Sequence, residues 1–285
     1  MKSAPRLRTL LVLGRAADWP AVWSNTLAGW LLGGGGNFWK LPFLLLGLTA
    51  LYTGGAFLND AFDADADRQR RPERPIPSGK ISAQLVWRAG FGQLVAGIFL
   101  LLFCSQLSAG AAILLALFIL LYNFSHKFFN AAPWLLGACR FWIYVIAGAA
   151  GVWGLNGWPI LAGVALAFYT AGLGVIGRRK NNLTPVSLWP LALLAAPIAL
   201  ALAMNAGGYR ARAMGIAILF AAWTIWSVRK IFTGNVAIIA ANLVAGIVLV
   251  DWLAVAPQIS FWLGAVIFLA LFGLTKWLQK FAPAS

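Results

Sequence analysis

The chain has 285 residues, of which 61% are hydrophobic and 10% are charged, and its mean hydropathy is +0.82. These values exclude an ordinary soluble domain and are typical of an integral membrane protein. The 22 Lys and Arg outnumber the 7 Asp and Glu, which gives a net charge of +15. Because the basic residues gather between apolar runs, we interpret this charge as a signal for membrane orientation and for contact with membrane lipids. We expect no nucleic acid as a partner.

Apolar runs long enough to span a bilayer recur from one end of the chain to the other. An all-α transmembrane bundle is therefore predicted, as a single domain over residues 1–285. Lys and Arg concentrate in alternate connections, which predicts a multi-pass protein of a bacterial inner membrane with its amino terminus and the polar loop 60–81 in the cytoplasm. The ten predicted helices cover residues 14–32, 41–59, 82–104, 108–125, 133–151, 158–177, 186–204, 210–231, 235–256 and 260–279.

The second predicted helix ends in a run that holds most of the carboxylates of the chain. Asp60, Asp63 and Asp67 are spaced i, i+3 and i+7, so on a helix they point to one face, with the amide of Asn59 beside them. An Asp inside a bilayer costs about 2.5–3.5 kcal/mol and three like charges repel, so a bound cation is expected to compensate. Oxygen ligands in this arrangement suit Mg²⁺ shared with the phosphates of a substrate. The three Asp residues are thus predicted as metal ligands and as catalytic residues.

A basic stretch follows the acids directly. Guanidinium groups bind phosphate oxygens well, so Arg68, Arg71 and Arg74 are predicted to bind substrate phosphate, together with the amide of Asn59. The alternative is a solvated acidic helix end whose Asp residues pair with these arginines. Ser82 is expected to cap the next helix.

Two segments carry a resemblance to a known family. Residues 59–67 read Asn-Asp-x-x-Asp-x-x-x-Asp, and residues 74–79 read Arg-Pro-Ile-Pro-Ser-Gly. Here the sequence resembles the UbiA superfamily of intramembrane prenyltransferases, and the helix order extends the resemblance to about Pro257. The run at residues 137–140 looks like the EboC-like branch. The resemblance implies nine family helices, with a tenth added at the carboxy terminus, and Mg²⁺-dependent transfer of a prenyl group from an isoprenyl diphosphate.

One part of the family pattern is missing. The superfamily normally carries a second acidic motif, which holds a second Mg²⁺, in the loop after the sixth helix. Here that loop contains Arg178, Arg179 and Lys180, and no Asp or Glu occurs between Glu73 and Asp251. The three cations are predicted to bind the diphosphate directly. They could equally be ordinary cytoplasmic anchors, or the chemistry could have been lost.

Two further cations are candidate substrate ligands. Lys127 ends the fourth predicted helix on the side of the acidic motif, and the alternative for this residue is an ordinary flanking cation. Arg140 lies within an apolar helix, so it must either pair or line a polar cavity. An ion pair with Asp251 explains Arg140 as well as a substrate contact does.

The sequence thus supports two hypotheses of different classes. The first is an Mg²⁺-dependent intramembrane transferase that moves a prenyl or related lipid-like group from a diphosphate donor to an unidentified acceptor, and the intact first motif argues for it. The second is a non-catalytic membrane protein that binds or transports a lipid-like or phosphorylated small molecule, and the missing second motif argues for it. Release of inorganic diphosphate would distinguish the two.

Overall fold

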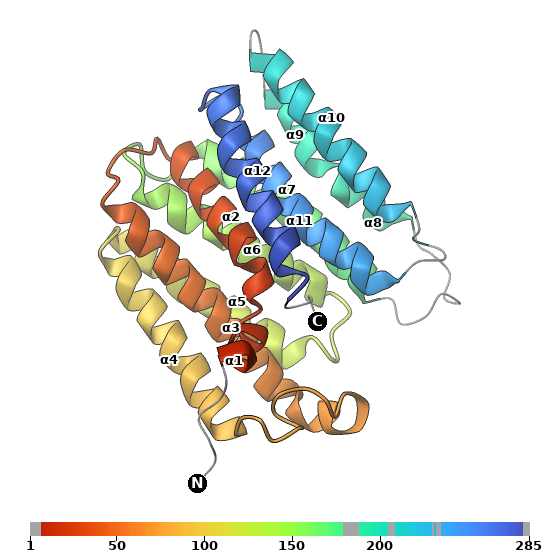
Figure 1. Ribbon diagram of the computed structural model, residues 1–285. Helices are drawn as coiled ribbons and strands as arrows, with labels where there is room; N and C mark the ends of the chain where they lie inside the picture. Colours follow the sequence, from red (N-terminus) through yellow and green to blue (C-terminus); the bar gives the residue numbers. More distant parts are fainter. Residues whose placement is uncertain (1–6, 179–187, 205–208, 230, 232–234, 282–285) are drawn as a thin grey trace.

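The computed structural model describes residues 7–178, 188–204, 209–229, 231 and 235–281. Within these ranges the chain forms helices and no strand, arranged as a bundle (Figure 1). The predicted all-α class is confirmed. The helices are α1 (Leu7–Leu13), α2 (Trp19–Leu32), α3 (Lys40–Arg70), α4 (Ala83–Leu102), α5 (Gln106–Ser125), α6 (Ala132–Ala150), α7 (Gly157–Gly177), α8 (Trp189–Leu194), α9 (Ala196–Met204), α10 (Tyr209–Val228), α11 (Val236–Ala254) and α12 (Phe261–Leu278), with a 3-10 turn η1 (Ala16–Asp18) between α1 and α2.

Eight helices of the described part are long and apolar enough to cross a membrane, namely α3 to α7 and α10 to α12. The protein is therefore an integral, multi-pass membrane protein. Two of the ten predicted spans are broken. The first, predicted over residues 14–32, is interrupted near its start by η1, which leaves α2 with 14 residues, a length of about 21 Å. The seventh is divided at Ala195, because Pro197 in the next turn has no backbone N–H with which to continue the helix.

The prediction of a loop over residues 60–81 is wrong in its first half, because α3 continues through the acidic run to Arg70. Alanines between the acids favour a helix, and the helix ends before Pro72, where the α conformation becomes unfavourable. With 31 residues α3 is about 46 Å long, well beyond the roughly 30 Å of a hydrocarbon core. As predicted, Ser82 caps α4, since its hydroxyl accepts a hydrogen bond from the backbone N–H of Leu85 at 3.3 Å.

Helices α3 and α4 approach each other closely through glycines. A Cβ atom built on Gly54 would lie 2.8 Å from the carbonyl oxygen of Gly90, and one built on Gly97 would lie 2.8 Å from the carbonyl oxygen of Gly47. Small residues let membrane helices pack backbone against backbone in this way. The contact therefore fixes the position of α3, which carries the acidic run.

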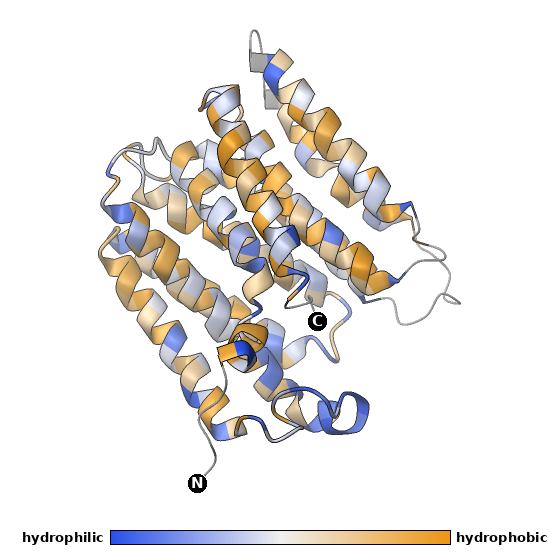
Figure 2. Ribbon diagram, in the orientation of Figure 1, coloured by the Kyte–Doolittle hydropathy of each residue, from blue (hydrophilic) through white to orange (hydrophobic). Residues whose placement is uncertain are grey.

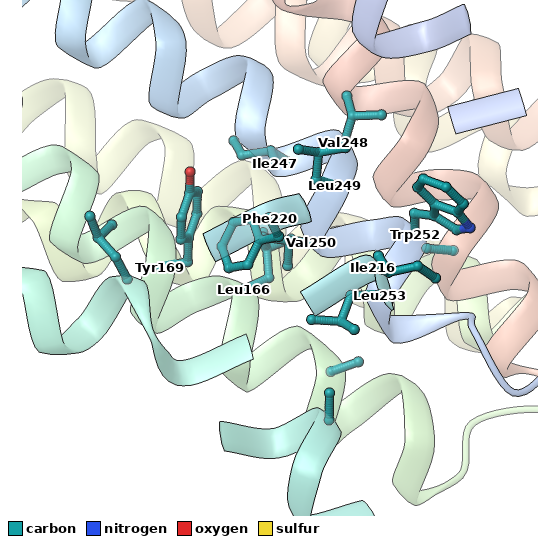
Figure 3. Close-up of a cluster of buried hydrophobic side chains, with 14 of the residues drawn as sticks. Leu166, Tyr169, Ile216, Phe220, Ile247, Val248, Leu249, Val250, Trp252 and Leu253 are labelled. Carbon is teal, nitrogen blue, oxygen red and sulfur yellow. The ribbon is translucent and has the colours of Figure 1, made fainter. Parts of the chain in front are cut away.

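Buried side chains fill the spaces between helices, while apolar side chains also cover the outside. Tyr169 of α7, Phe220 of α10 and Ile247 of α11 lie in one buried cluster (Figure 3). Outward-facing residues such as Val95 and Val266 are 68% and 71% exposed, and hydrophobic residues run along the outer helices in Figure 2. This apolar exterior is what a lipid environment requires.

Candidate functional site

A cavity of about 480 Å³ lies among α3, α5, α6, α7 and α11, next to the break between α1 and α2. Apolar side chains such as Leu48, Leu115 and Val244 form much of its wall. The lining residues include four arginines and only one carboxylate, so the polar part of the cavity is strongly positive. The polar residues of the wall are Arg15, Asp18, Tyr52, Asn59, Arg71, Tyr122, Asn123, Arg140, Thr170 and Arg178.

The cavity separates the predicted site residues into two groups. Four of them, Asn59, Arg71, Arg140 and Arg178, line its wall. Six others in the described part are not among the lining residues. They are Asp60, Asp63, Asp67, Arg68, Arg74 and Lys127. Arg179 and Lys180 lie outside the described residues.

Asp60 and Asp67 share one cation. The Nη1 atom of Arg74 lies 2.7 Å from Asp67 Oδ2 and 3.6 Å from Asp60 Oδ1, and all three side chains are largely buried. The two acids are two helical turns apart on one face of α3, and the segment after Pro72 brings Arg74 back over that face. Removing one partner of a buried pair leaves an uncompensated charge, so this arrangement holds the end of α3 and the following segment together.

Asp63 points to another part of the protein. Its Oδ1 atom lies 2.9 Å from Lys127 Nζ and 3.2 Å from His126 Nε2, in the connection between α5 and α6. Lys127 also donates a hydrogen bond to the carbonyl of Phe62 at 2.9 Å. Lys127 is therefore part of the acidic cluster, and Asp63 ties α3 to the end of α5.

The carboxylates of the motif are thus held by cations. Arg68 pairs with Asp65 at 2.9 Å, but both side chains are well exposed, so this pair contributes little. Pairing of the acids with the arginines that follow is the arrangement that the alternative interpretation predicted. Among the described residues no three His, Cys, Asp or Glu side chains are gathered closely enough to hold a metal ion. The motif still offers an oxygen-only donor set, of the kind that Mg²⁺ prefers.

Arg178 lies at the end of α7 and holds the same connection. Its Nη2 atom donates a hydrogen bond to the carbonyl of His126 at 2.6 Å, and its Nη1 atom donates to the carbonyl of Phe129 at 3.1 Å. Because Asp63 also contacts this connection, the ends of α3, α5 and α7 meet at one place. Arg178 lines the cavity there.

The proposed ion pair between Arg140 and Asp251 is not direct. No contact within 4.0 Å joins their charged atoms; Asn25 lies between them instead, accepting a 2.7 Å hydrogen bond from Arg140 Nη1 and donating to both carboxylate oxygens of Asp251 at 2.7 and 2.9 Å. Ser24 and Tyr144 also donate to Asp251, which is fully buried. The carboxylate is therefore satisfied by neutral donors. Arg140 contacts the amide of Asn25 and lines the cavity wall.

Sequence reasoning missed Arg15, which lines the cavity at the break between α1 and α2. Arg15 has a φ of 47°, a left-handed conformation that is unfavourable for a residue with a side chain. Its Nη2 atom donates a 2.5 Å hydrogen bond to Asn59 Oδ1, and Asn59 donates in turn to Asn123 Oδ1 at 3.1 Å. The helix break thus delivers a cation to the first residue of the motif. No local sequence pattern marks a left-handed arginine.

Comparisons with known proteins point in one direction. A model of the UbiA prenyltransferase family matches residues 19–232. A digeranylgeranylglyceryl phosphate synthase of Methanoregula boonei is 38% identical over 117 residues, which are 39% of this chain and 40% of that relative. A 4-hydroxybenzoate octaprenyltransferase of Acidovorax ebreus is 30% identical over 156 residues, which are 52% of this chain and 54% of that relative. The matches therefore span about half the length of these relatives or less.

Two solved structures share the fold. The apo structure of a UbiA homologue from Aeropyrum pernix K1 superposes with a TM-score of 0.53 at 15% identity and covers 93% of this chain and 98% of that one. A structure from a study of digeranylgeranylglyceryl phosphate synthase in membranes gives a TM-score of 0.51 at 19% identity, with 97% and 95% of the two chains covered.

Proposed function

Since the chain belongs to the UbiA prenyltransferase family, we propose that it transfers a prenyl or related lipid-like group from a diphosphate donor to an acceptor within the membrane. The supporting observation is the cavity itself, in which an apolar wall meets four arginines. An isoprenyl tail is apolar and a diphosphate is an anion, so the two parts of the wall match the two parts of one donor.

The diphosphate end of the donor is proposed to lie where α3, α5 and α7 meet. Arg71 and Arg178 line the cavity at the ends of α3 and α7, and guanidinium groups are suited to phosphate oxygens. Lys127, paired with Asp63, adds a positive charge one residue after His126, whose carbonyl Arg178 contacts. Arg68 lies further out and is proposed as an outer contact for the anion.

Mg²⁺ is the proposed cofactor, with Asp60, Asp63 and Asp67 as its ligands. The fit rests on their oxygen donors and on the close placement of Asp60 and Asp67, whose carboxylates both contact Arg74 Nη1. When bound, Mg²⁺ would stabilise the negative charge of the departing diphosphate. Arg74 contacts oxygens of two of these carboxylates, so it would compete with the ion for them. The apolar wall excludes water from the allylic centre.

The basic loop is proposed to replace the second acidic motif. Arg178, Arg179 and Lys180 would supply permanent positive charge where the family normally binds a second cation. We further propose that the amino terminus and the end of α3 lie on the cytoplasmic side, since the basic connections cluster there. A bacterial inner membrane and the EboC-like branch stay predictions.

The test is release of inorganic diphosphate by the purified full chain from geranyl, farnesyl and geranylgeranyl diphosphate, with and without Mg²⁺. Mg²⁺-dependent release supports the transferase. Binding of these donors without any release, in the presence of extracted membrane lipids as a source of acceptor, favours the non-catalytic alternative. Arg71→Gln should weaken donor use, whereas Arg88→Gln, an exposed arginine of α4 that does not line the cavity, is the matched control.

A further inference from the structure

Lys276 lies near the end of α12 and turns into the protein. Its Nζ atom donates hydrogen bonds to Asn242 Oδ1 of α11 at 2.7 Å and to Gln279 Oε1 at 2.9 Å, and it lies 5.8 Å from the centre of the Trp223 ring of α10. A lysine at a membrane boundary usually extends its amine toward water. The amine of Lys276 is instead held between α10, α11 and α12.

The groups that hold Lys276 are themselves fixed. The amide nitrogen of Gln279 donates to the carbonyl of Ala241 at 2.8 Å, so the amide oxygen faces the amine of Lys276. The indole N–H of Trp223 donates to the backbone carbonyl of Asn242 at 2.9 Å, which keeps this ring next to the amine. The side chain of Asn242 is buried. The position of the amine is therefore set by a hydrogen-bond network.

A second cation adjoins the same aromatic side chains. Trp223 and Trp226 stack with their ring centres 5.0 Å apart, and Arg229 Cζ lies 5.1 Å from the centre of the Trp226 ring. Lys276, the two rings and Arg229 thus form a continuous row at the ends of α10 and α12, in which each cation lies against an aromatic ring. The side chain of Arg229 is exposed and donates no hydrogen bond to the described residues.

Neither cation has a carboxylate partner among the described residues. The only Asp or Glu after Glu73 is Asp251, which is fully buried and is bound by donors from α2 and α6. The amides and rings around Lys276 are neutral, and they use two of the three N–H donors of its amine. The protein therefore leaves two positive charges at this place for an anion from outside.

Apolar side chains flank the row on the outer surface of the protein. Ile225 and Trp226 of α10 are exposed, and so are Trp277 and Phe281 at the end of α12. The rings of Trp277 and Phe281 contact each other, with their centres 4.8 Å apart. Indole side chains at a membrane boundary lie at the level of the lipid headgroups. A phospholipid here would place its phosphate near the cations and its chains on apolar surface.

We propose that the ends of α10 and α12 form a binding site for the headgroup of an anionic phospholipid. Lys276 and Arg229 supply the positive charge, Trp223 and Trp226 keep the two cations in place, and the acyl chains lie along the exposed faces of both helices. Because α12 lies beyond the residues 19–232 that match the family model, this site belongs to a part of the chain outside that match. It is separate from the cavity proposed to hold the prenyl donor.

The experiment is native mass spectrometry of the purified full chain in detergent micelles. It measures the affinity for the first molecule of dioleoylphosphatidylglycerol and, separately, of dioleoylphosphatidylcholine, which has the same acyl chains. We expect phosphatidylglycerol to bind about 10- to 30-fold more tightly, because each basic side chain near an anionic lipid contributes about fivefold.

Substitutions locate the site. Lys276→Gln and Arg229→Gln should each lower the preference for phosphatidylglycerol by about fivefold. Gln279→Glu provides a carboxylate for Lys276 within the protein, so it should lower the preference by a similar factor although the lysine is still present. Arg88→Gln is the matched control, because Arg88 is an exposed cation near the start of α4 and should leave the preference unchanged. The unfolding midpoint in phosphatidylcholine nanodiscs shows that each variant is folded, and the exposed Arg229 can be replaced without disturbing the network.

Equal affinity for the two lipids overturns the proposal. A preference that falls as far in Arg88→Gln as in Arg229→Gln and Lys276→Gln overturns it too, because net charge would then explain the attraction. Inorganic phosphate is added as a competitor, and displacement of phosphatidylglycerol by an equal concentration of phosphate would assign the cations to a free anion and refute the lipid site. None of these measurements involves prenyl transfer, so their failure leaves the proposed function untouched.

Discussion

Replacing Arg74 by Gln separates the two interpretations of the acidic run. In the wild type the guanidinium lies 2.7 Å from Asp67 and 3.6 Å from Asp60, whose side chains are 11% and 12% exposed. Arg74→Gln removes the guanidinium that both nearly buried carboxylates contact, and leaves Arg15 as the other positive charge that acts on Asp60. Breaking a fully buried pair costs about 3–5 kcal/mol, and the remaining exposure here reduces the expected loss to about 2 kcal/mol. At roughly 2–4 °C per kcal/mol this lowers Tm by about 4–8 °C.

Mg²⁺ should reverse that loss if the carboxylates are metal ligands. A cation at about 100 times its Kd stabilises the folded protein by about 2.7 kcal/mol, which is close to the expected deficit. We therefore expect the rise in Tm on adding Mg²⁺ to be larger in Arg74→Gln than in the wild type, where Arg74 competes for the same oxygens. Thermal unfolding in nanodiscs, with Mg²⁺ titrated from a chelated baseline, measures both effects.

The control is Arg68→Gln. Because the pair of Arg68 with Asp65 is exposed, its loss should change Tm by no more than about 1–2 °C, with or without Mg²⁺. If Arg74→Gln loses stability and Mg²⁺ restores none of it, the acids are structural partners of Arg74 and the metal assignment fails. If Arg74→Gln loses no stability, the pairing itself is not what holds the end of α3.

Three other outcomes follow from the geometry. Asp60→Asn and Asp63→Asn should each lower diphosphate release by about 100-fold or more while leaving membrane insertion intact, and full turnover at saturating Mg²⁺ in either variant would remove these residues from the chemistry. Arg178→Gln should weaken donor binding and loosen the connection after α5 without changing orientation, as measured by donor affinity beside a topology reporter; unchanged affinity would make Arg178 a structural residue. Gly54→Leu should destabilise the protein by at least about 1–3 kcal/mol, because its Cβ would lie 2.8 Å from the Gly90 carbonyl, and an unchanged unfolding midpoint would contradict the tight packing of α3 on α4.

Hydropathy was enough to find the helical segments, because a membrane span must be apolar over a fixed length whatever it packs against. It did not find where two of those segments break. Pro197 explains one break from local chemistry, but the left-handed Arg15 depends on contacts with Asn59 that form only in the folded bundle. Apolar composition alone also placed the end of α3 too early, since a helix can continue into water.

The candidate site shows the same division between local and long-range information. Spacing along α3 put the acids on one side of a helix, but packing decided that Asp63 meets Lys127 while Asp60 and Asp67 meet Arg74. Sequence reasoning suggested a direct ion pair between Arg140 and Asp251. In the structure the side-chain amide of Asn25 lies between the two charged groups. Such bridges depend on distances between three helices, which no spacing in one helix encodes.

Because α3 is one continuous helix, it also fixes the distance between residues along the cavity wall. Leu48 and Asn59 both line the cavity and lie on the same rigid rod, so their separation is set by the helix rise at about 16 Å. A donor anchored by its diphosphate beyond Asn59 can extend a straight tail along that wall for about this length. Longer tails must bend or pass between helices into the surrounding lipid. Under the proposed function, the eleven helical steps from Leu48 to Asn59 would thereby discriminate donors by the length of their hydrocarbon tail.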